Sequence, residues 1–498
     1  VLRMYGWDVP ILEKHSFRQT QTAISSYYLV HEGFRLSYQT PIFGAPWSIP
    51  MEFPAYQYIV AFFTKYLHLP LEKTGRFISL FFYYASLFLI YKIFKKALFS
   101  FRDRIVILSI LFASPFYMIY SRVFLIETTA VFFSIATFYF CYSFLNGNKK
   151  HNLVFGAFFG ILAALTKITT FSIFMFFISL VILYFWKQEG IIFKLKSIKS
   201  KMMLFVACIV IPLIIFMIWN SFADSLKAMN PLAKDLLTTT SLSSWNFGTL
   251  DQRLSGGVYL KLGKRIESIL GHIILIPLLL TIFFDKKKRF LNILLLSSFA
   301  IGPAVFLNLY YAHEYYSVAN GIFLLLAFAI SIIFIINKIQ IKVLSYALFI
   351  IIILILFLGN KGNFRDIAKA RNYNLNYITI LKSITEKRDV LLINGQDYSS
   401  MTPYLSKRRA IMDVANRSVN NVVLKKSLQL TGKDNIKALL LCGKIRKNKP
   451  FVEERLNAFR LYDKKISTFY LKDKKKIKCH IYGKKNRIVT FFRKNKIQ

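Results

Sequence analysis

Residues 121 to 359 alternate long apolar runs with short lysine-rich connections, and this alternation restricts the fold more than any other feature of the chain. Runs such as residues 123–145 are long enough to cross a hydrocarbon core of about 30 Å as helices. Inside such a core, only helices or closed barrels satisfy the backbone polar groups. The runs lack the two-residue alternation of barrel strands. The pattern therefore predicts an all-α polytopic membrane protein.

The composition agrees with a membrane bundle, because hydrophobic residues make up 55% and aromatic residues 17% of the 498 residues. The small residues of GAFFG at 156–160 are typical of a close helix-packing face rather than of a phosphate-binding loop. We expect about ten spanning helices, each near the length that a bilayer requires. Their expected ranges are 76–93, 104–121, 124–145, 153–168, 170–186, 203–219, 268–284, 290–309, 318–337 and 342–359.

Basic residues predict the orientation of this bundle. Every lysine-rich connection falls on one side of the expected spans, and the positive-inside rule makes that side cytoplasmic. These connections are 92–104, 149–150, 187–201, 286–289 and 338–342. Residues 1–75, 220–267 and 360–498 then lie outside, which a basic tail permits because long domains translocate largely regardless of charge. The chain begins at Val1 with a polar segment, so we expect one further helix before it in the intact protein.

Three regions follow from this topology. Residues 1–75 form an outer segment, in which the tyrosine-rich stretch 53–69 is expected to be an interfacial helix. Residues 76–359 form the transmembrane bundle, and the more polar residues 360–498 form a small soluble α/β domain outside the cytoplasm. The strands expected in that domain are VLLIN at 390–394, RRAIMD at 408–413 and ALLLC at 438–442.

The charge and the cysteines exclude several other classes of protein. The net charge of +43 does not indicate nucleic-acid binding, because the lysines lie at helix ends and in the tail, not on one amphipathic face. No metal-ligand or nucleotide motif is present, so the sequence implies no cofactor. A requirement for a divalent metal stays an open alternative. Cys141 and Cys208 lie in apolar runs and are expected to be packing residues. Cys442 and Cys479 lie in the tail, and a disulfide between them is one alternative.

Polar residues of the N-terminal outer segment form two of four clusters expected at the outer face. In the first, Asp8 precedes His15, Arg18 and Gln19, which fall on one face of a helix by their spacing. A solvated interfacial helix is the alternative explanation of this cluster. In the second, Glu52 stands just ahead of a proline suited to the first turn of a helix, near the positive end of its dipole.

The other two clusters lie at the outer ends of expected spans. Arg122 is explained by snorkelling to the interface. Glu127 is a functional candidate, because a carboxylate inside an apolar run is costly. Lys167, between two spans, is grouped with His313, Glu314 and the tyrosines that follow them. An aromatic belt would account for those tyrosines but not for His313 and Glu314.

Several motifs in the chain resemble the integral-membrane C-type glycosyltransferases of family 39, which include protein O-mannosyltransferases and the lipid A aminoarabinose transferase. The resemblance spans most of residues 7–330, in order, and is nearest to a bacterial branch with a His-Ser-Trp/Phe-Arg-Gln-Thr motif. The motifs are HSFRQTQTA at 15–23, EFPAYQY at 52–58, GRFISLFF at 75–82, SPFYMIYSRVFLIE at 114–127, LTK at 165–167 and HEYYSVA at 313–319.

The resemblance implies a polyprenyl-phosphate sugar donor, transfer at the outer face and inversion at the sugar. It also implies an acidic residue early in the first outer loop, and basic and tyrosine residues that bind the lipid phosphate. The usual Asp-Glu pair of that loop aligns here with His15 and Ser16, so Asp8, His15 and Glu52 are rival bases. The predicted catalytic residues are Asp8, His15, Glu52 and Glu127, and the predicted substrate-binding residues are Arg18, Gln19, Lys167, His313, Tyr315 and Tyr316.

The sequence therefore predicts a glycosyltransferase of a bacterial inner membrane, with membrane lipids around it. Its sugar would pass from a polyprenyl-phosphate carrier to a lipid, glycan or protein acceptor outside the membrane. One alternative is a transporter or flippase of lipid-linked saccharides, which would place ionisable residues near the bilayer midplane. The other is a non-catalytic relative, which the departure at His15 and Ser16 keeps open.

Overall fold

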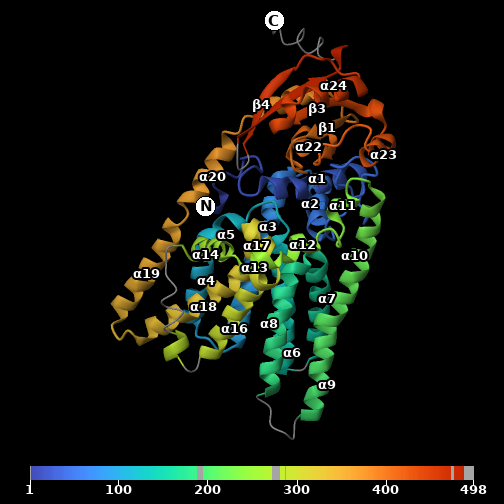
Figure 1. Ribbon diagram of the computed structural model, residues 1–498. Coiled ribbons are helices and arrows are strands. Elements are labelled where there is room, and N and C mark those ends of the chain that lie inside the picture. Colours follow the sequence, from blue (N-terminus) through green and yellow to red (C-terminus); the bar gives the residue numbers. More distant parts are fainter. Residues whose placement is uncertain are drawn as a thin grey trace. The chain divides into compact units, whose positions relative to one another are not determined.

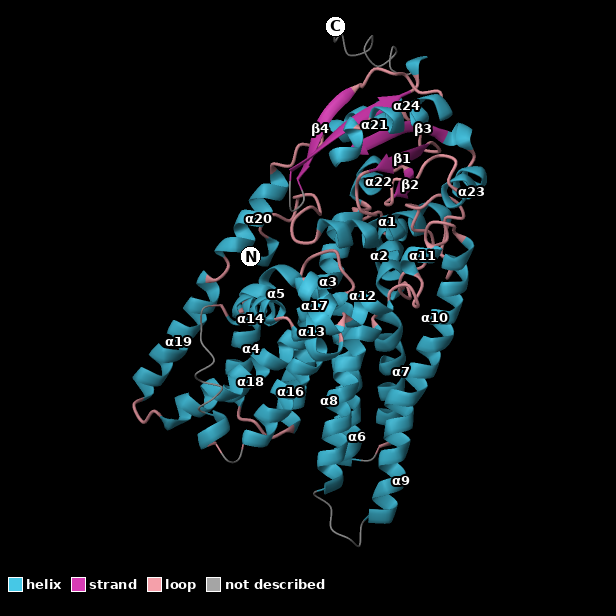
Figure 2. Cartoon of the chain, viewed as in Figure 1, coloured by secondary structure: helices cyan, strands magenta, loops and turns pink. Residues whose placement is uncertain are grey.

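The computed structural model describes residues 2–147, 149–187, 194–271, 281–285, 288–472 and 476–486. The chain divides into two compact units (Figure 1). The first unit contains Val1–Trp7, Lys73–Asn220 and Ser243–Ile367, and the second contains Asp8–Glu72, Ser221–Leu242 and Ala368–Gln498. All the strands of the described residues belong to the second unit (Figure 2).

Long helices build the first unit, and several of them run on into residues of the second. The N-terminal set is α3 Leu71–Lys96, α4 Phe101–Ala113, α5 Pro115–Tyr120, α6 Glu127–Gly147, α7 Lys150–Thr166, α8 Ile168–Lys187 and α9 Lys194–Phe205, followed by a π-helical stretch Val206–Val210 and α10 Ile211–Met229. The C-terminal set is α12 Ser243–Phe247, α13 Leu250–Leu254, α14 Gly256–Leu270, α16 Arg289–Val305, α17 Leu307–Ala312, α18 Ser317–Lys338, α19 Lys342–Leu358 and α20 Lys361–Arg371.

Within the described residues, six helices are long and apolar enough to cross a membrane, and the chain is a multi-pass membrane protein. They are Leu71–Lys96, Glu127–Gly147, Ile168–Phe185, Ile198–Met229, Glu314–Lys338 and Lys342–Ile384. The expected spans 153–168 and 290–309 correspond to the shorter apolar helices α7 and α16. The expected span 268–284 falls mostly on residues 272–280, which lie outside the described part of the chain.

The expected single span at 104–121 is wrong in one respect, because it consists of two helices. Ser114 leaves the helical region with φ −53° and ψ 124°, and α5 begins at Pro115. The residue before a proline is disfavoured in the α conformation, so α4 ends there.

Packing inside the first unit confirms the expected role of the small residues. A Cβ added at Gly156 would lie 2.8 Å from Cys208 Sγ, and one at Gly160 would lie 2.9 Å from Pro212 Cγ. Cys141 and Cys208 are buried in the same apolar cluster, as predicted. At the centre of the unit lies α18, whose span is 89% buried and which packs against α4, α8 and α16.

The second unit contains a five-stranded sheet in the order β2-β1-β3-β5-β4. β1 Val390–Asn394, β2 Arg409–Asp413 and β3 Ile436–Cys442 are parallel and confirm the three expected strands. β4 Ser467–Lys472 and β5 Lys476–Gly483 add an antiparallel edge that the sequence did not indicate. A disulfide between Cys442 and Cys479 joins β3 to β5. The helices of this unit are α1 Ser16–Glu32, α2 Ala55–Tyr66, α11 Lys234–Leu237, α21 Asn376–Ile384, α22 Met401–Ser406, α23 Val422–Thr431 and α24 Lys449–Ala458.

Three segments distant in sequence fold together in this second unit. Residues 41–44 pair with the β2 edge: the Ala410 N–H donates to Pro41 O (3.0 Å) and the Met412 N–H donates to Ile42 O (2.8 Å). The Asn230 side chain donates to the carbonyl of Gly44 at 2.9 Å. One compact body thus unites parts of the three segments that the charge pattern assigns to the same side of the membrane.

Candidate functional site

A buried ion pair lies where three helices of the first unit begin or end. Lys167 is the single extended residue between α7 and α8, and Glu127 is the first residue of α6. Lys167 Nζ lies 2.5 Å from Glu127 Oε1, and the two side chains are 7% and 3% exposed. The packing of α6 against α7 and α8 brings these two residues together, although 40 positions separate them in sequence.

Tyrosines cover the ammonium group of this pair. Lys167 Nζ lies 4.3 Å from the ring centroid of Tyr316 and 4.9 Å from that of Tyr315. Both tyrosines lie on a 3₁₀ turn, Glu314–Tyr316, between α17 and α18. The His313 ring lies 5.4 Å from the Tyr315 ring and 6.1 Å from the Trp245 ring. The structure therefore brings together five of the predicted residues: Glu127, Lys167, His313, Tyr315 and Tyr316.

Several buried polar atoms of this pair and of its neighbours in sequence have no hydrogen-bond partner within the described part of the chain. One is Glu127 Oε2, and the others are threonine hydroxyls within two positions of Glu127 or Lys167. A buried polar group left unsatisfied costs about 1–3 kcal/mol, so each such group is a candidate partner for water or a polar ligand. The hydroxyls are those of Thr128, Thr129, Thr166 and Thr169.

Two residues of this region were missed by sequence reasoning. Tyr120 Oη donates to Glu314 Oε1 at 2.6 Å, and Arg265 Nη1 lies 3.0 Å from Glu314 Oε2. Arg265 belongs to α14, in the segment 220–267 that the charge pattern places outside the membrane with mixed helix and turn signals. Tyr120 is hidden in an apolar run, and no local pattern distinguishes it from a packing residue.

Arg122 corrects the snorkelling explanation. Its side chain is 1% exposed and donates hydrogen bonds to the carbonyls of Arg3, Tyr5 and Gly6. Arg76, which is also buried, donates to the carbonyl of Trp7 at 3.0 Å. These arginines anchor the N-terminal turn of the first unit through buried hydrogen bonds to its carbonyls.

The remaining predicted residues form a second group, which belongs to the second unit. Arg18 forms an ion pair with Glu52 and a hydrogen bond with Gln21. Gln19 is buried, and its side-chain amide donates to Lys14 O at 2.8 Å, so it supports the turn before α1. His15 is the N-cap of α1 with a left-handed backbone, φ 54°. Asp8 lies at the start of this unit, seven positions before His15.

The predicted residues thus fall into two groups, one in each unit. That they line a single pocket stays a prediction. The described residues contain no group of three or more His, Cys, Asp or Glu side chains placed to hold a metal ion.

No known family and no curated protein matches the sequence. Solved structures do match the fold. ArnT from Cupriavidus metallidurans, bound to undecaprenyl phosphate, superimposes with a TM-score of 0.60 at 10% identity over 96% of each chain. Its apo state gives the same score and identity over 97% of this chain and 96% of that one. The archaeal oligosaccharyltransferase AglB from Archaeoglobus fulgidus gives a TM-score of 0.49 at 11% identity.

The two ArnT structures match this chain over nearly its whole length. The chain therefore shares the fold of ArnT: a helical bundle with a small C-terminal α/β domain.

Proposed function

We propose that this protein is a glycosyltransferase that takes a sugar from a polyprenyl-phosphate donor and transfers it to an acceptor at the outer face of the membrane. The observation that carries the proposal is the buried Lys167–Glu127 pair, with its tyrosines and unsatisfied threonines, in a chain whose fold is shared with an undecaprenyl-phosphate-bound protein. A bacterial inner membrane, with the second unit outside the cytoplasm, belongs to the same proposal.

In this proposal, Lys167 binds the phosphate of the donor. An ammonium group has three hydrogen-bond donors, and Glu127 accepts one of them. The remaining donors and the threonine hydroxyls suit a phosphate, whose oxygens accept several hydrogen bonds. Burial strengthens this attraction, because the local dielectric constant is far below that of water.

The tyrosines are assigned to the same phosphate. Tyr316 and Tyr315 each combine a ring that contacts the Lys167 ammonium with a hydroxyl able to donate to an anion. His313, which stacks on Tyr315, extends the polar end of the site. We assign donor binding to Lys167, Tyr315, Tyr316 and His313.

The proposed reaction is a displacement at the anomeric carbon of the sugar. An oxygen or nitrogen of the acceptor forms a bond to that carbon, and the bond from the carbon to the phosphate oxygen breaks. The electron pair leaves on the lipid phosphate, whose charge Lys167 stabilises. The acceptor proton passes to a general base, for which Asp8 is our first choice and Glu52 and His15 are the rivals. Glu127 holds Lys167 in place, and its Oε2 is a further acceptor.

The test of this proposal measures donor binding and transfer separately. Undecaprenyl phosphate alone should raise the thermal unfolding midpoint of the full chain in detergent, because a ligand that binds the folded state stabilises it. Membranes with the wild-type chain should transfer radiolabelled sugar from at least one of a set of polyprenyl-phosphate hexoses to an endogenous acceptor. Both signals should be lost in Lys167→Ala.

The matched control is Lys338→Ala. Lys338 lies at the far end of α18, about 30 Å from Tyr316 at 1.5 Å per helical residue. Its removal should leave both signals unchanged. A wild-type chain that neither binds undecaprenyl phosphate nor transfers any hexose, or Lys167→Ala membranes as active as those of the control, would contradict the proposal.

A further inference from the structure

The three parallel strands of the second unit lie in the spatial order β2-β1-β3, so the direction in which successive strands are added reverses at β1. From β1 the chain passes to β2 on one side, and from β2 it crosses to β3 on the other side of β1. In open α/β sheets, ligands bind in the crevice outside the carboxyl ends of the strands at such a switch point. Here that crevice lies between the loops that follow β1 and β3.

The structure has an open cavity of about 380 Å³ at this place, and its lining comes from all three loops. The loop after β1 contributes Gln396 and Asp397, the loop after β2 contributes Val414 and Asn416, and the turn after β3 contributes Lys444 and Ile445. None of the residues predicted as catalytic or substrate-binding lines it. The volume is at the lower end of the range usual for small-ligand sites.

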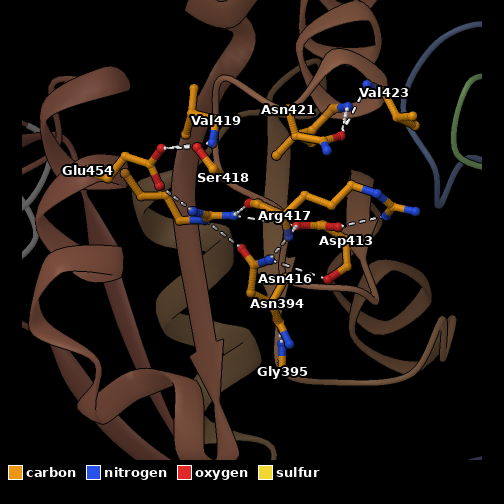
Figure 3. A network of polar contacts seen from close by, with 12 residues as sticks. Asn394, Gly395, Asp413, Asn416, Arg417, Ser418, Val419, Asn421, Val423 and Glu454 are labelled. Atoms are coloured by element: carbon orange, nitrogen blue, oxygen red, sulfur yellow. Dashed lines mark hydrogen bonds and ion pairs between the residues drawn. The ribbon is translucent and has the colours of Figure 1, made fainter.

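Buried polar side chains hold two of these loops in place (Figure 3). Asp413, at the end of β2, and Arg455, on α24, are both fully buried, and Arg455 Nη2 lies 3.4 Å from Asp413 Oδ2. Asn394, at the end of β1, donates to Asp413 Oδ2 at 3.0 Å and accepts from Arg455 Nε at 3.0 Å. Buried charges are costly unless paired, so this network fixes the ends of β1 and β2, from which two of the lining loops start.

The third loop is fixed by the close approach of β1 to β3. Gly395 has φ +74°, and a Cβ there would lie 2.0 Å from Cys442 O, so no larger residue fits. The Gly395 N–H donates to Asn416 Oδ1 at 2.8 Å. Gln396 Nε2 lies 2.9 Å from Cys442 Sγ, on the disulfide that joins β3 to β5. The cavity is therefore pre-formed rather than dependent on mobile loops.

We infer that this cavity is a saccharide-binding site, which takes one neutral sugar unit. Gln396 and Asn416 supply amides, Asp397 a carboxylate and Lys444 an ammonium group, so that donors and acceptors stand together without a net charge. Hydroxyl groups of a sugar act as both donors and acceptors and match this set, whereas an anion would meet Asp397 and a cation would meet Lys444. Val414 and Ile445 offer apolar surface to the C–H groups of the ring.

The inference does not depend on the proposed transfer reaction, and its test is a binding measurement. The full chain is purified in a detergent without a sugar head group. Saturation-transfer NMR is then recorded with the methyl glycosides of glucose, galactose, mannose and N-acetylglucosamine. At least one glycoside should bind saturably at millimolar concentration. Gln396→Ala and Lys444→Ala should each weaken that binding by about tenfold, as expected for the loss of one good hydrogen bond.

Lys447→Ala is the matched control, because Lys447 is an exposed lysine of the same 3₁₀ turn and does not line the cavity. Thermal unfolding midpoints close to that of the wild type show that each variant is folded. Ile445→Trp, which fills the cavity, should abolish binding. Saturable binding of none of the four glycosides, or equal affinity in the Gln396, Lys444 and Lys447 variants, would overturn the inference. A chain that binds a glycoside but transfers no sugar would leave it standing and contradict only the proposed function.

Discussion

Lys167 Nζ and Glu127 Oε1 lie 2.5 Å apart, in a pair that is almost wholly buried at the ends of membrane helices. Such a pair is weak support for stability, because the attraction between the charges barely offsets the loss of their hydration. Removal of one partner, however, leaves a buried charge uncompensated and costs about 3–5 kcal/mol. We therefore propose that the pair is kept for the reaction rather than for its contribution to folding.

A structural role and a functional role of the Lys167–Glu127 pair predict different results for a double variant. Lys167→Met and Glu127→Gln should each lower the thermal unfolding midpoint, since each leaves one group unpaired. The double variant should recover most of the loss, because no buried charge remains. It should still transfer no sugar. Wild-type transfer by the double variant would show that the pair is structural only.

The Tyr316 hydroxyl is expected to contact the donor phosphate. Tyr316→Phe keeps the ring that lies 4.3 Å from Lys167 Nζ and removes only the hydroxyl. We expect the KM for the polyprenyl-phosphate donor to rise by about threefold to tenfold, with a smaller change in kcat, as for the loss of one hydrogen bond. Tyr346→Phe, on the exposed side of α19, is the control and should change neither constant. An unchanged KM in Tyr316→Phe would show that the Tyr316 hydroxyl does not bind the donor and that the side chain serves only in packing.

Much of this fold is visible in the sequence because its signals are local. The apolar runs at 124–145 and 318–337 predict α6 and α18 within a few residues, and GAFFG at 156–160 predicts the close approach at Gly156. VLLIN and ALLLC predict β1 and β3, since buried parallel strands are continuous apolar runs. The break at Ser114 was missed because the hydrophobic pattern continues across it, although Pro115 marks the position.

The long-range contacts are what the sequence does not show. Arg265 and Glu314 are 49 positions apart, and no local sequence pattern around either residue predicts that they form an ion pair. Phe43 pairs with Ile411 across most of the chain, although residues 41–44 have no strand-like run of their own. Glu127 and Lys167 were both predicted as site residues, but only the packing of the helices shows that they are paired.

A lysine of the second unit should make stability depend on pH. Burial lowers the pKa of Lys407 to about 7, while the Glu72 carboxylate acts against this shift and Lys382 adds to it. The Tyr404 ring, with its centroid 3.4 Å from Lys407 Nζ, also favours the charged form. Below pH 7 the amine is charged in both the folded and the unfolded chain, and the folded chain bears the cost of burying the charge.

Between pH 7 and the unfolded value near 10.4, only the unfolded chain binds the proton, so stability should rise with pH. Lys407→Met should therefore raise the unfolding midpoint by a few degrees at pH 6, and by progressively less towards pH 10. Lys425→Met, which removes an exposed lysine of α23, is the control for the loss of a positive charge. A constant difference between Lys407→Met and the wild type across this range would contradict the shifted pKa.

The disulfide between Cys442 and Cys479 bears on topology, because disulfides persist in oxidising compartments outside the cytoplasm. Cys141 and Cys208 are buried, so all four native cysteines should be silent towards a membrane-impermeant maleimide. Lys425→Cys, in the second unit, should be labelled in intact cells. Lys338→Cys, on the expected cytoplasmic side, should be labelled only after permeabilisation. The reverse pattern would place the second unit inside the cytoplasm.

The general base remains to be chosen among Asp8, Glu52 and His15. Asp8 is our first choice, because it lies nearest the start of the first outer loop, where the resemblance places an acidic residue. Glu52 is restrained by its ion pair with Arg18. We therefore expect Asp8→Asn to reduce the turnover of labelled sugar transfer by about 10²–10⁴-fold, the usual contribution of a general base, with little change in donor binding.

Glu52→Gln should cause a smaller loss of turnover. Arg18→Gln, which breaks the same ion pair and leaves the carboxylate, should match that loss if Glu52 is structural. A severe loss in Glu52→Gln but not in Arg18→Gln would transfer the role of base to Glu52. Full activity in both Asp8→Asn and Glu52→Gln would eliminate a carboxylate base in this segment. It would leave His15, at the left-handed N-cap of α1, as the group that takes the acceptor proton.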